Sequence, residues 1–193
     1  SNLILQRVGA KLWIARIMIT WGLLSACTLL VTTTTQFYLV RFLLGVAEAG
    51  FLPGVLFYLT QWYPSYRRGR VIALFMIGLP LSSVIGGPLS GWIMSSFDQL
   101  HGLRGWQWLF LLEAIPSVLL GVATLWILPN SFQQARWLSD DDKAQLAADL
   151  AADDAEDTGS KQRFRDGFFN LKVWMLGGID FSILLSAYAM GFW

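Results

Sequence analysis

Two ionisable side chains, Arg41 and Glu48, lie inside a run of mostly apolar residues at positions 37–59. A helix of about 23 residues crosses a bilayer, because each residue rises about 1.5 Å across a hydrocarbon core about 30 Å thick. A charge near the bilayer centre costs about 3 kcal/mol or more, so it normally serves a function. Seven residues apart, the two side chains point to nearly the same side of a helix, about 10 Å apart along its axis. They are too far apart for a direct salt bridge, so each needs another partner, and a ligand could be one.

The two residue types suggest different chemistry. Arg41 offers a planar, permanently charged fork that matches a carboxylate or a phosphate at two points. Glu48 lies at the middle of the run, where loss of water makes the charged form costly, so it could load and release a proton. Position alone leaves alternatives open. Arg41 could extend outward to the membrane surface or pair with an acid elsewhere, and Glu48 could be permanently protonated and bonded between helices.

Three further polar side chains lie in apolar runs. Glu113 lies near the outer end of its run, beside Pro116, and a structural bond to a neighbouring helix is the favoured interpretation. Asp180 lies near the middle of the last run and is a candidate for proton coupling. Tyr188, two turns further on, is a candidate substrate-binding donor, with core packing as the alternative.

Motifs of catalysis and cofactor binding are absent from the sequence. There is no His-Glu-x-x-His, no Gly-x-Ser-x-Gly and no glycine-rich phosphate loop. The single cysteine, Cys27, excludes an internal disulfide and a cysteine-based metal site. We therefore expect no enzymatic activity, no metal and no cofactor.

The composition is that of a membrane protein. The chain is 55% hydrophobic and only 14% charged, whereas a soluble domain averages about 25% charged residues. It has no basic stripe with exposed aromatic residues, so nucleic-acid binding is not expected. Hydrophobic windows predict five membrane spans, at residues 12–33, 37–59, 71–96, 108–128 and 171–193.

Lysine and arginine residues orient these spans. Twelve of the 14 lie in segments 1–16, 61–70 and 129–172, and only Arg41 and Arg104 lie on the alternate side. The positive-inside rule then makes loops 1–11, 61–70 and 129–170 cytoplasmic. The twelve are Arg7, Lys11, Arg16, Arg67, Arg68, Arg70, Arg136, Lys143, Lys161, Arg163, Arg165 and Lys172.

Aromatic residues at the ends of the runs agree with this orientation. Trp62 and Tyr63 are expected to mark the inner membrane interface, and Trp106 and Trp108 the outer one.

The third span is rich in small residues at helical spacing. Small residues recur every four positions, which predicts close packing against other helices. Two prolines, Pro80 and Pro88, are expected to allow bending. The small residues are Gly78, Ser82, Gly86 and Ser90, with Gly87 and Gly91 beside them, and Gly50 and Gly54 give the second span a similar face.

The polar connection at 129–170 contains one predicted helix. Ser139 followed by three aspartates reads as an N-cap with an acidic first turn, and the helix should extend to about Ala152. The connection is interpreted as a solvated linker whose end approaches the membrane, with partner binding as the alternative.

Several stretches resemble the major facilitator superfamily and, within it, the anion:cation symporter family. The loop at 1–11 is most similar to those of the bacterial tartrate, phthalate and hydroxyphenylacetate permeases of that family. Gln6 and Ala10 stand where the family loop usually has an acid and an arginine. The matching stretches are 1–11 (SNLILQRVGAK), 41–54 (RFLLGVAEAGFLPG), 66–70 (YRRGR), 86–91 (GGPLSG), 105–116 (GWQWLFLLEAIP) and 135–139 (ARWLS).

The resemblance implies an all-α, polytopic membrane helix bundle of the major facilitator fold. The chain is expected to be an internal fragment, from the end of helix 2 through helix 7 of a twelve-helix transporter. Residues 1–128 would belong to the N-terminal six-helix bundle, 129–170 to the cytoplasmic inter-domain loop, and 171–193 to the first helix of the C-terminal bundle.

The resemblance also implies roles for the two charges. The family arginine at the position of Arg41 contacts the substrate's carboxylate, and the glutamate seven residues later takes part in proton coupling. The sequence therefore suggests a proton symporter that imports a mono- or dicarboxylate by alternating access, a monomer in a bacterial inner membrane. An antiporter or facilitator without proton coupling, and a membrane receptor that does not transport, remain as alternatives.

Overall fold

The computed structural model describes residues 8–156 and 170–191. Every secondary-structure element in these residues is a helix, which confirms the all-α prediction. The chain forms two compact units, Ser1–Ala151 and Ala152–Trp193. The predicted cytoplasmic loop at 1–11 lies mostly outside the described residues.

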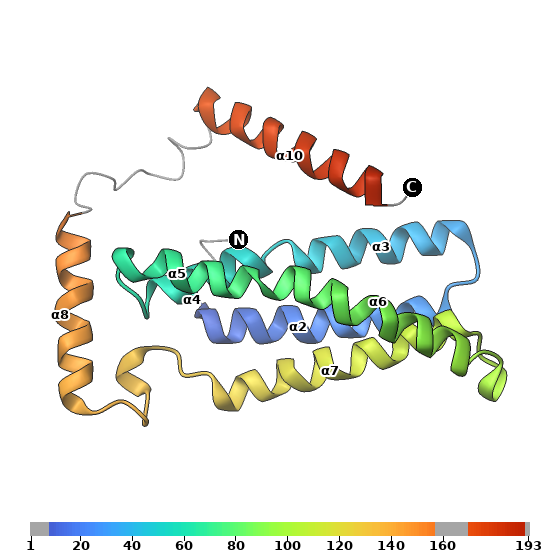
Figure 1. Ribbon diagram of the computed structural model, residues 1–193, viewed down its shortest axis with the longest axis horizontal. Coiled ribbons are helices and arrows are strands. Elements are labelled where there is room, and N and C mark those ends of the chain that lie inside the picture. The colour runs from blue at the N-terminus through green and yellow to red at the C-terminus, as the bar shows by residue number, and fades with distance from the viewer. Residues whose placement is uncertain (1–7, 157–169, 192–193) are drawn as a thin grey trace. The chain divides into compact units, whose positions relative to one another are not determined.

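Helix α2 (Ala10–Cys27) is the central helix of the first unit and continues into the short 3-10 helix η1 (Thr28–Leu30). It packs most extensively against α7 (Gly105–Ile127) and also contacts α3 and α4 (Figure 1). The α2–α7 contact is close, because a Cβ atom on Gly22 would lie 2.7 Å from Val118 Cγ2. The Ser117 hydroxyl also donates to the Met18 carbonyl at 3.0 Å.

The second predicted span consists of two helices, α3 (Thr34–Glu48) and α4 (Phe51–Thr60). The predicted span at 37–59 is present within the candidate span Thr34–Thr60, but its helix is interrupted between Glu48 and Phe51. Pro53 gives the reason, because it has no N–H to donate to the Ala49 carbonyl and its ring crowds that carbonyl. Glu48 is consequently the last residue of α3 rather than a mid-helix residue.

The break between α3 and α4 packs on Trp13 of α2. The Trp13 indole N–H donates to the Gly50 carbonyl at 3.1 Å. A Cβ atom on Gly50 would lie 3.0 Å from this indole, and one on Gly54 would lie 2.9 Å from its Cδ1. The predicted contact face at these two glycines is confirmed.

The third predicted span also has a break, between α5 (Ser65–Met76) and α6 (Gly78–Ser96). The same mechanism applies, since Pro80 removes the hydrogen bond to the Met76 carbonyl. Pro88 lies inside α6. The predicted close packing of the α6 glycines is not made within the described residues, because nothing lies within 4 Å of a Cβ atom at Gly78, Gly86, Gly87 or Gly91.

Two 3-10 helices flank α7. Helix η2 (Leu100–Gly102) precedes it and η3 (Phe132–Gln134) follows it. The start of α7 is fixed by the Asp98 carboxylate, which accepts from the Gly105 backbone N–H at 2.8 Å.

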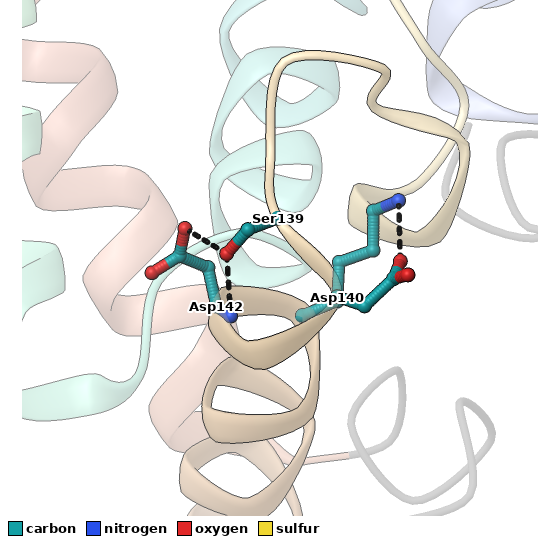
Figure 2. A network of polar contacts seen from close by, with 4 residues as sticks. Ser139, Asp140 and Asp142 are labelled. Atoms are coloured by element: carbon teal, nitrogen blue, oxygen red, sulfur yellow. Dashed lines mark hydrogen bonds and ion pairs between the residues drawn. The ribbon is translucent and has the colours of Figure 1, made fainter.

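Helix α8 (Asp140–Glu156) is the helix predicted in the polar connection, and it ends four residues later than predicted. Figure 2 shows its first turn, where the Asp142 backbone N–H donates to the Ser139 hydroxyl at 3.1 Å. That hydroxyl donates in turn to the Asp142 carboxylate at 2.6 Å, and Lys143 pairs with Asp140 at 3.6 Å. The predicted Ser139 cap is confirmed.

The segment before α8 contacts the loop that follows α4, and α8 itself contacts the start of α5. The rings of Trp62 and Trp137 stack at 5.8 Å with an interplanar angle of 7°, and Trp62 is only 8% exposed. The Tyr66 hydroxyl donates to the Asp149 carboxylate at 3.3 Å. Trp62 is therefore packed against this chain. Its expected place at the inner membrane interface stays a prediction.

Four helical segments of the described residues are long and apolar enough to cross a membrane. They correspond to the first four predicted spans, and the protein is a multi-pass membrane protein. The fifth prediction coincides with α10 (Leu171–Gly191), a helix of 21 residues in the second unit. The four segments are Ala10–Leu30, Thr34–Thr60, Ser65–Ser96 and Gly105–Ile127.

Candidate substrate cavity

A cavity of about 400 Å³ lies among α2, α3 and α7. Its volume falls in the range of sites for small molecules, about 300–1,000 Å³. Both residues singled out first from the sequence, Arg41 and Glu48, line it. The other lining residues are Trp21, Gly22, Ser25, Leu44, Phe110, Glu113 and Ser117.

Arg41 lies between two aromatic rings. Its guanidinium carbon is 5.1 Å from the centre of the Phe37 ring, one turn earlier on α3, and 5.3 Å from the centre of the Phe110 ring on α7. The attraction between a cation and a ring face holds the guanidinium without using its N–H donors. No carboxylate in residues 8–156 or 170–191 forms a salt bridge with Arg41. The fork is therefore available to an anion in the cavity.

Glu48 lies on the same side of α3 as Arg41, as the seven-residue spacing predicted. Both side chains reach the same cavity without forming a salt bridge with each other. Glu48 is exposed to the cavity rather than enclosed between helices. The arrangement separates an anion-binding group from a proton-binding group within one space.

Glu113 is the lining residue for which the sequence favoured a structural role. The expected structural bond exists, because the Ser90 hydroxyl of α6 donates to Glu113 Oε1 at 3.2 Å. The same carboxylate also lines the cavity with Arg41 and Glu48, which was not expected. The sequence did show an acidic residue within an apolar run, which is a signal of a functional site. It could not show that Glu113 faces the cavity, because that depends on how the helices pack.

The two remaining candidates lie in the second unit. Asp180 lies on α10 and is exposed there. The side chain of Tyr188 lies outside the described residues.

Metal-binding clusters were also sought. The described part of the chain has no group of three or more His, Cys, Asp or Glu side chains that could hold a metal ion. The cavity chemistry therefore consists of one guanidinium, two carboxylates, hydroxyl groups and aromatic rings.

The sequence model of the Major Facilitator Superfamily matches residues 2–193. The chain belongs to the major facilitator superfamily. This agrees with the resemblance seen in the motifs and with the helical structure.

Major facilitator proteins from several bacteria are similar to the whole chain. A candidate metabolite transport protein of Pseudomonas putida, NicT, is 86% identical over 193 residues. A candidate tartrate transporter of Agrobacterium vitis is 46% identical over 193 residues, and a quinolone resistance transporter of Acinetobacter baumannii is 40% identical over 196 residues. Each alignment covers 100% of this chain but 44% of the relative's length. No solved structure matches the chain significantly.

Proposed function

We propose that the whole protein is a secondary active transporter that imports an organic carboxylate anion together with protons. The observation that carries the proposal is the shared cavity: Arg41, with no carboxylate partner among the described residues, and Glu48 face the same space within the membrane spans. A site with one anion-binding and one proton-binding group is what proton-coupled anion transport requires.

Arg41 would bind the substrate's carboxylate. A guanidinium forms two parallel hydrogen bonds with a carboxylate, and charge-assisted bonds of this kind are about twice as strong as neutral ones. The rings of Phe37 and Phe110 restrict its motion, so less rotamer freedom is lost on binding.

Glu48 would carry the proton. Coupling requires that the carboxyl be neutral in one state of the transport cycle and charged in the other, and that the substrate favour one of them. An anion in the cavity repels a charged Glu48, so anion binding and proton binding support each other. This linkage is reciprocal, as for any two ligands of one protein.

Alternating access would come from the relative motion of two helical halves about this cavity. Residues 1–128 would belong to one half and residues 171–193 to the other. The α6 glycines fit this proposal, because no atom of the described residues lies within 4 Å of a Cβ atom at Gly78, Gly86, Gly87 or Gly91, so another helix could approach closely there. Loops 61–70 and 129–170 would then lie in the cytoplasm of a bacterium, with the protein in the inner membrane.

The names of relatives support an organic substrate but do not agree on one. Tartrate, in the name of one relative, is a dicarboxylate, which fits Arg41. Another relative is named for quinolone resistance, which is a different activity from tartrate transport. The alternatives are an antiporter or facilitator without proton coupling, and a receptor that binds without transport.

The test uses the full-length protein in proteoliposomes and a panel of labelled mono- and dicarboxylates. Wild-type protein should accumulate at least one of them when a proton gradient is imposed. Arg41→Ala should weaken binding by about 10- to 100-fold, since charged hydrogen bonds contribute about 1.5–3 kcal/mol. Arg136→Ala is the matched control, because Arg136 is exposed before α8 and does not line the cavity. Unchanged affinity in Arg41→Ala would remove Arg41 from the site.

A further inference from the structure

We infer that Glu113 is a second proton-binding carboxylate of the cavity and that Ser90 holds it in both protonation states. The inference rests on the proposed transport function. It starts from a residue whose position in the sequence favoured a structural role.

The first argument is the location of Glu113. It lies inside α7, within the candidate span Gly105–Ile127, and its side chain is exposed to the cavity. A lone charge at such a position is costly and is normally compensated by an opposite charge or by a proton. No cation in the described part of the chain forms a salt bridge with Glu113, and its one hydrogen bond there comes from Ser90.

The second argument is the set of charges around Glu113. Helix α3 contributes Arg41 and Glu48 to the same cavity. Helix α6 and η1 contain no ionisable residue. On α2, the ionisable residues do not line the cavity: they are Lys11, Arg16 and Cys27.

One positive and two negative groups therefore face the anion. A substrate carboxylate bound to Arg41 adds a further negative charge to this space. Like charges disfavour each other's ionised forms, so binding of the anion favours a proton on each carboxylate. Both Glu48 and Glu113 should respond, because both line the cavity that the anion enters.

The third argument is the chemistry of the Ser90 hydroxyl. It donates to Glu113 Oε1 at 3.2 Å, which suits a charged carboxylate. A hydroxyl also accepts hydrogen bonds, so a protonated Glu113 can donate to the same oxygen atom. The contact between α6 and α7 then survives a change of protonation. A proton from water would bind a Glu113 carboxylate oxygen when the anion binds and would return to water when the anion leaves.

The experiment measures proton uptake when a carboxylate binds to the purified full-length protein, by calorimetry in buffers of different ionisation enthalpy. Glu113→Gln keeps the side-chain size and an oxygen that accepts from Ser90, but it cannot take up a proton. Proton uptake per bound anion should fall by about half in Glu113→Gln and in Glu48→Gln, and it should vanish in the double variant.

Ser90→Ala provides a second, independent readout. It removes the donor to Glu113 and leaves the groups that line the cavity unchanged. The Ser90 hydroxyl bonds the charged carboxylate more strongly than the protonated one, so the pH midpoint of anion binding should shift in Ser90→Ala. The midpoint should not shift when Ser90→Ala is added to Glu113→Gln, which has no carboxylate. A purely structural Ser90–Glu113 contact would lower the melting temperature and leave the pH profile unchanged.

The outcomes separate this inference from the proposed function. If proton uptake is that of wild type in Glu113→Gln but lower in Glu48→Gln, the role of Glu113 is wrong and proton coupling stands. If the wild-type protein binds a carboxylate without taking up protons, both the role of Glu113 and the proposed proton coupling are wrong. An unchanged pH midpoint in Ser90→Ala contradicts the inference even where Glu113→Gln does not fold.

Discussion

The guanidinium of Arg41 is positioned by rings rather than by a carboxylate of the described chain. Phe37 and Phe110 contact it from α3 and α7, and the cavity opens beside it. This leaves the charge and the donors of Arg41 for an incoming anion. At the residue scale, the site consists of the Arg41 guanidinium and the carboxylates of Glu48 and Glu113, which line the same cavity.

Phe37→Leu tests this positioning. Leucine keeps an apolar side chain but removes the ring face, so one cation–ring contact of about 0.5–1 kcal/mol is lost. The affinity for the carboxylate should fall about two- to fivefold, measured by equilibrium binding to the full-length protein. Phe42→Leu is the control on the same helix, because Phe42 is 68% exposed and does not line the cavity. Equal effects in both variants would contradict a positioning role.

At the element scale, proline and glycine residues determine where the helix of the second span is interrupted and where it packs against α2. Pro53 ends α3 at Glu48, and the indole of Trp13 packs against Gly50 and Gly54 just beyond the break. The backbone just after Glu48 is thus held against α2 by the Trp13 contact. We therefore expect packing at Trp13 to stabilise the helix that carries both charged groups.

Gly54→Leu tests that contact. A Cβ atom at this position would lie 2.9 Å from Trp13 Cδ1, and overpacking of this kind costs about 1–3 kcal/mol. The melting temperature of the detergent-purified protein should fall by several degrees. Gly45→Leu on α3 is the matched control, since nothing lies within 4 Å of its Cβ position. A melting temperature equal to that of wild type in Gly54→Leu would show that α2 does not pack there.

The sequence predicts helix type and approximate span ends well, because long apolar runs and caps such as Ser139 are local signals. It also places Arg41 and Glu48 on one side of a helix, because seven residues are close to two helical turns. The break before Pro53 was missed although the proline was visible, since hydropathy averages over it, whereas bending at Pro80 was expected. The cavity position of Glu113 and the burial of Trp62 depend on contacts between distant segments, which no local pattern specifies.

At the scale of the whole molecule, the first unit contains the cavity and the four candidate spans. The chain covers 44% of the length of the relatives described above. The orientation proposed for this unit in the membrane rests on the positions of its lysines and arginines and is open to direct test.

Cysteine labelling in intact cells tests the orientation. In full-length protein without native cysteines, His101→Cys in η2 should react with a membrane-impermeant maleimide from outside. Gln145→Cys in α8 should react only after the cells are permeabilised. Both positions lie outside the candidate spans, so access to the reagent depends on the side of the membrane. The reverse pattern would invert the proposed topology.

The central claim is that Arg41 binds the anion while Glu48 carries the proton, and the Glu48→Gln variant tests it most directly. In proteoliposomes of the full-length protein, uptake driven by a proton gradient and exchange of labelled for unlabelled carboxylate are measured side by side. Glutamine is neutral, as is a protonated glutamate, so exchange should continue while proton-driven accumulation is lost. Proton-driven accumulation at the wild-type rate in Glu48→Gln would contradict the account.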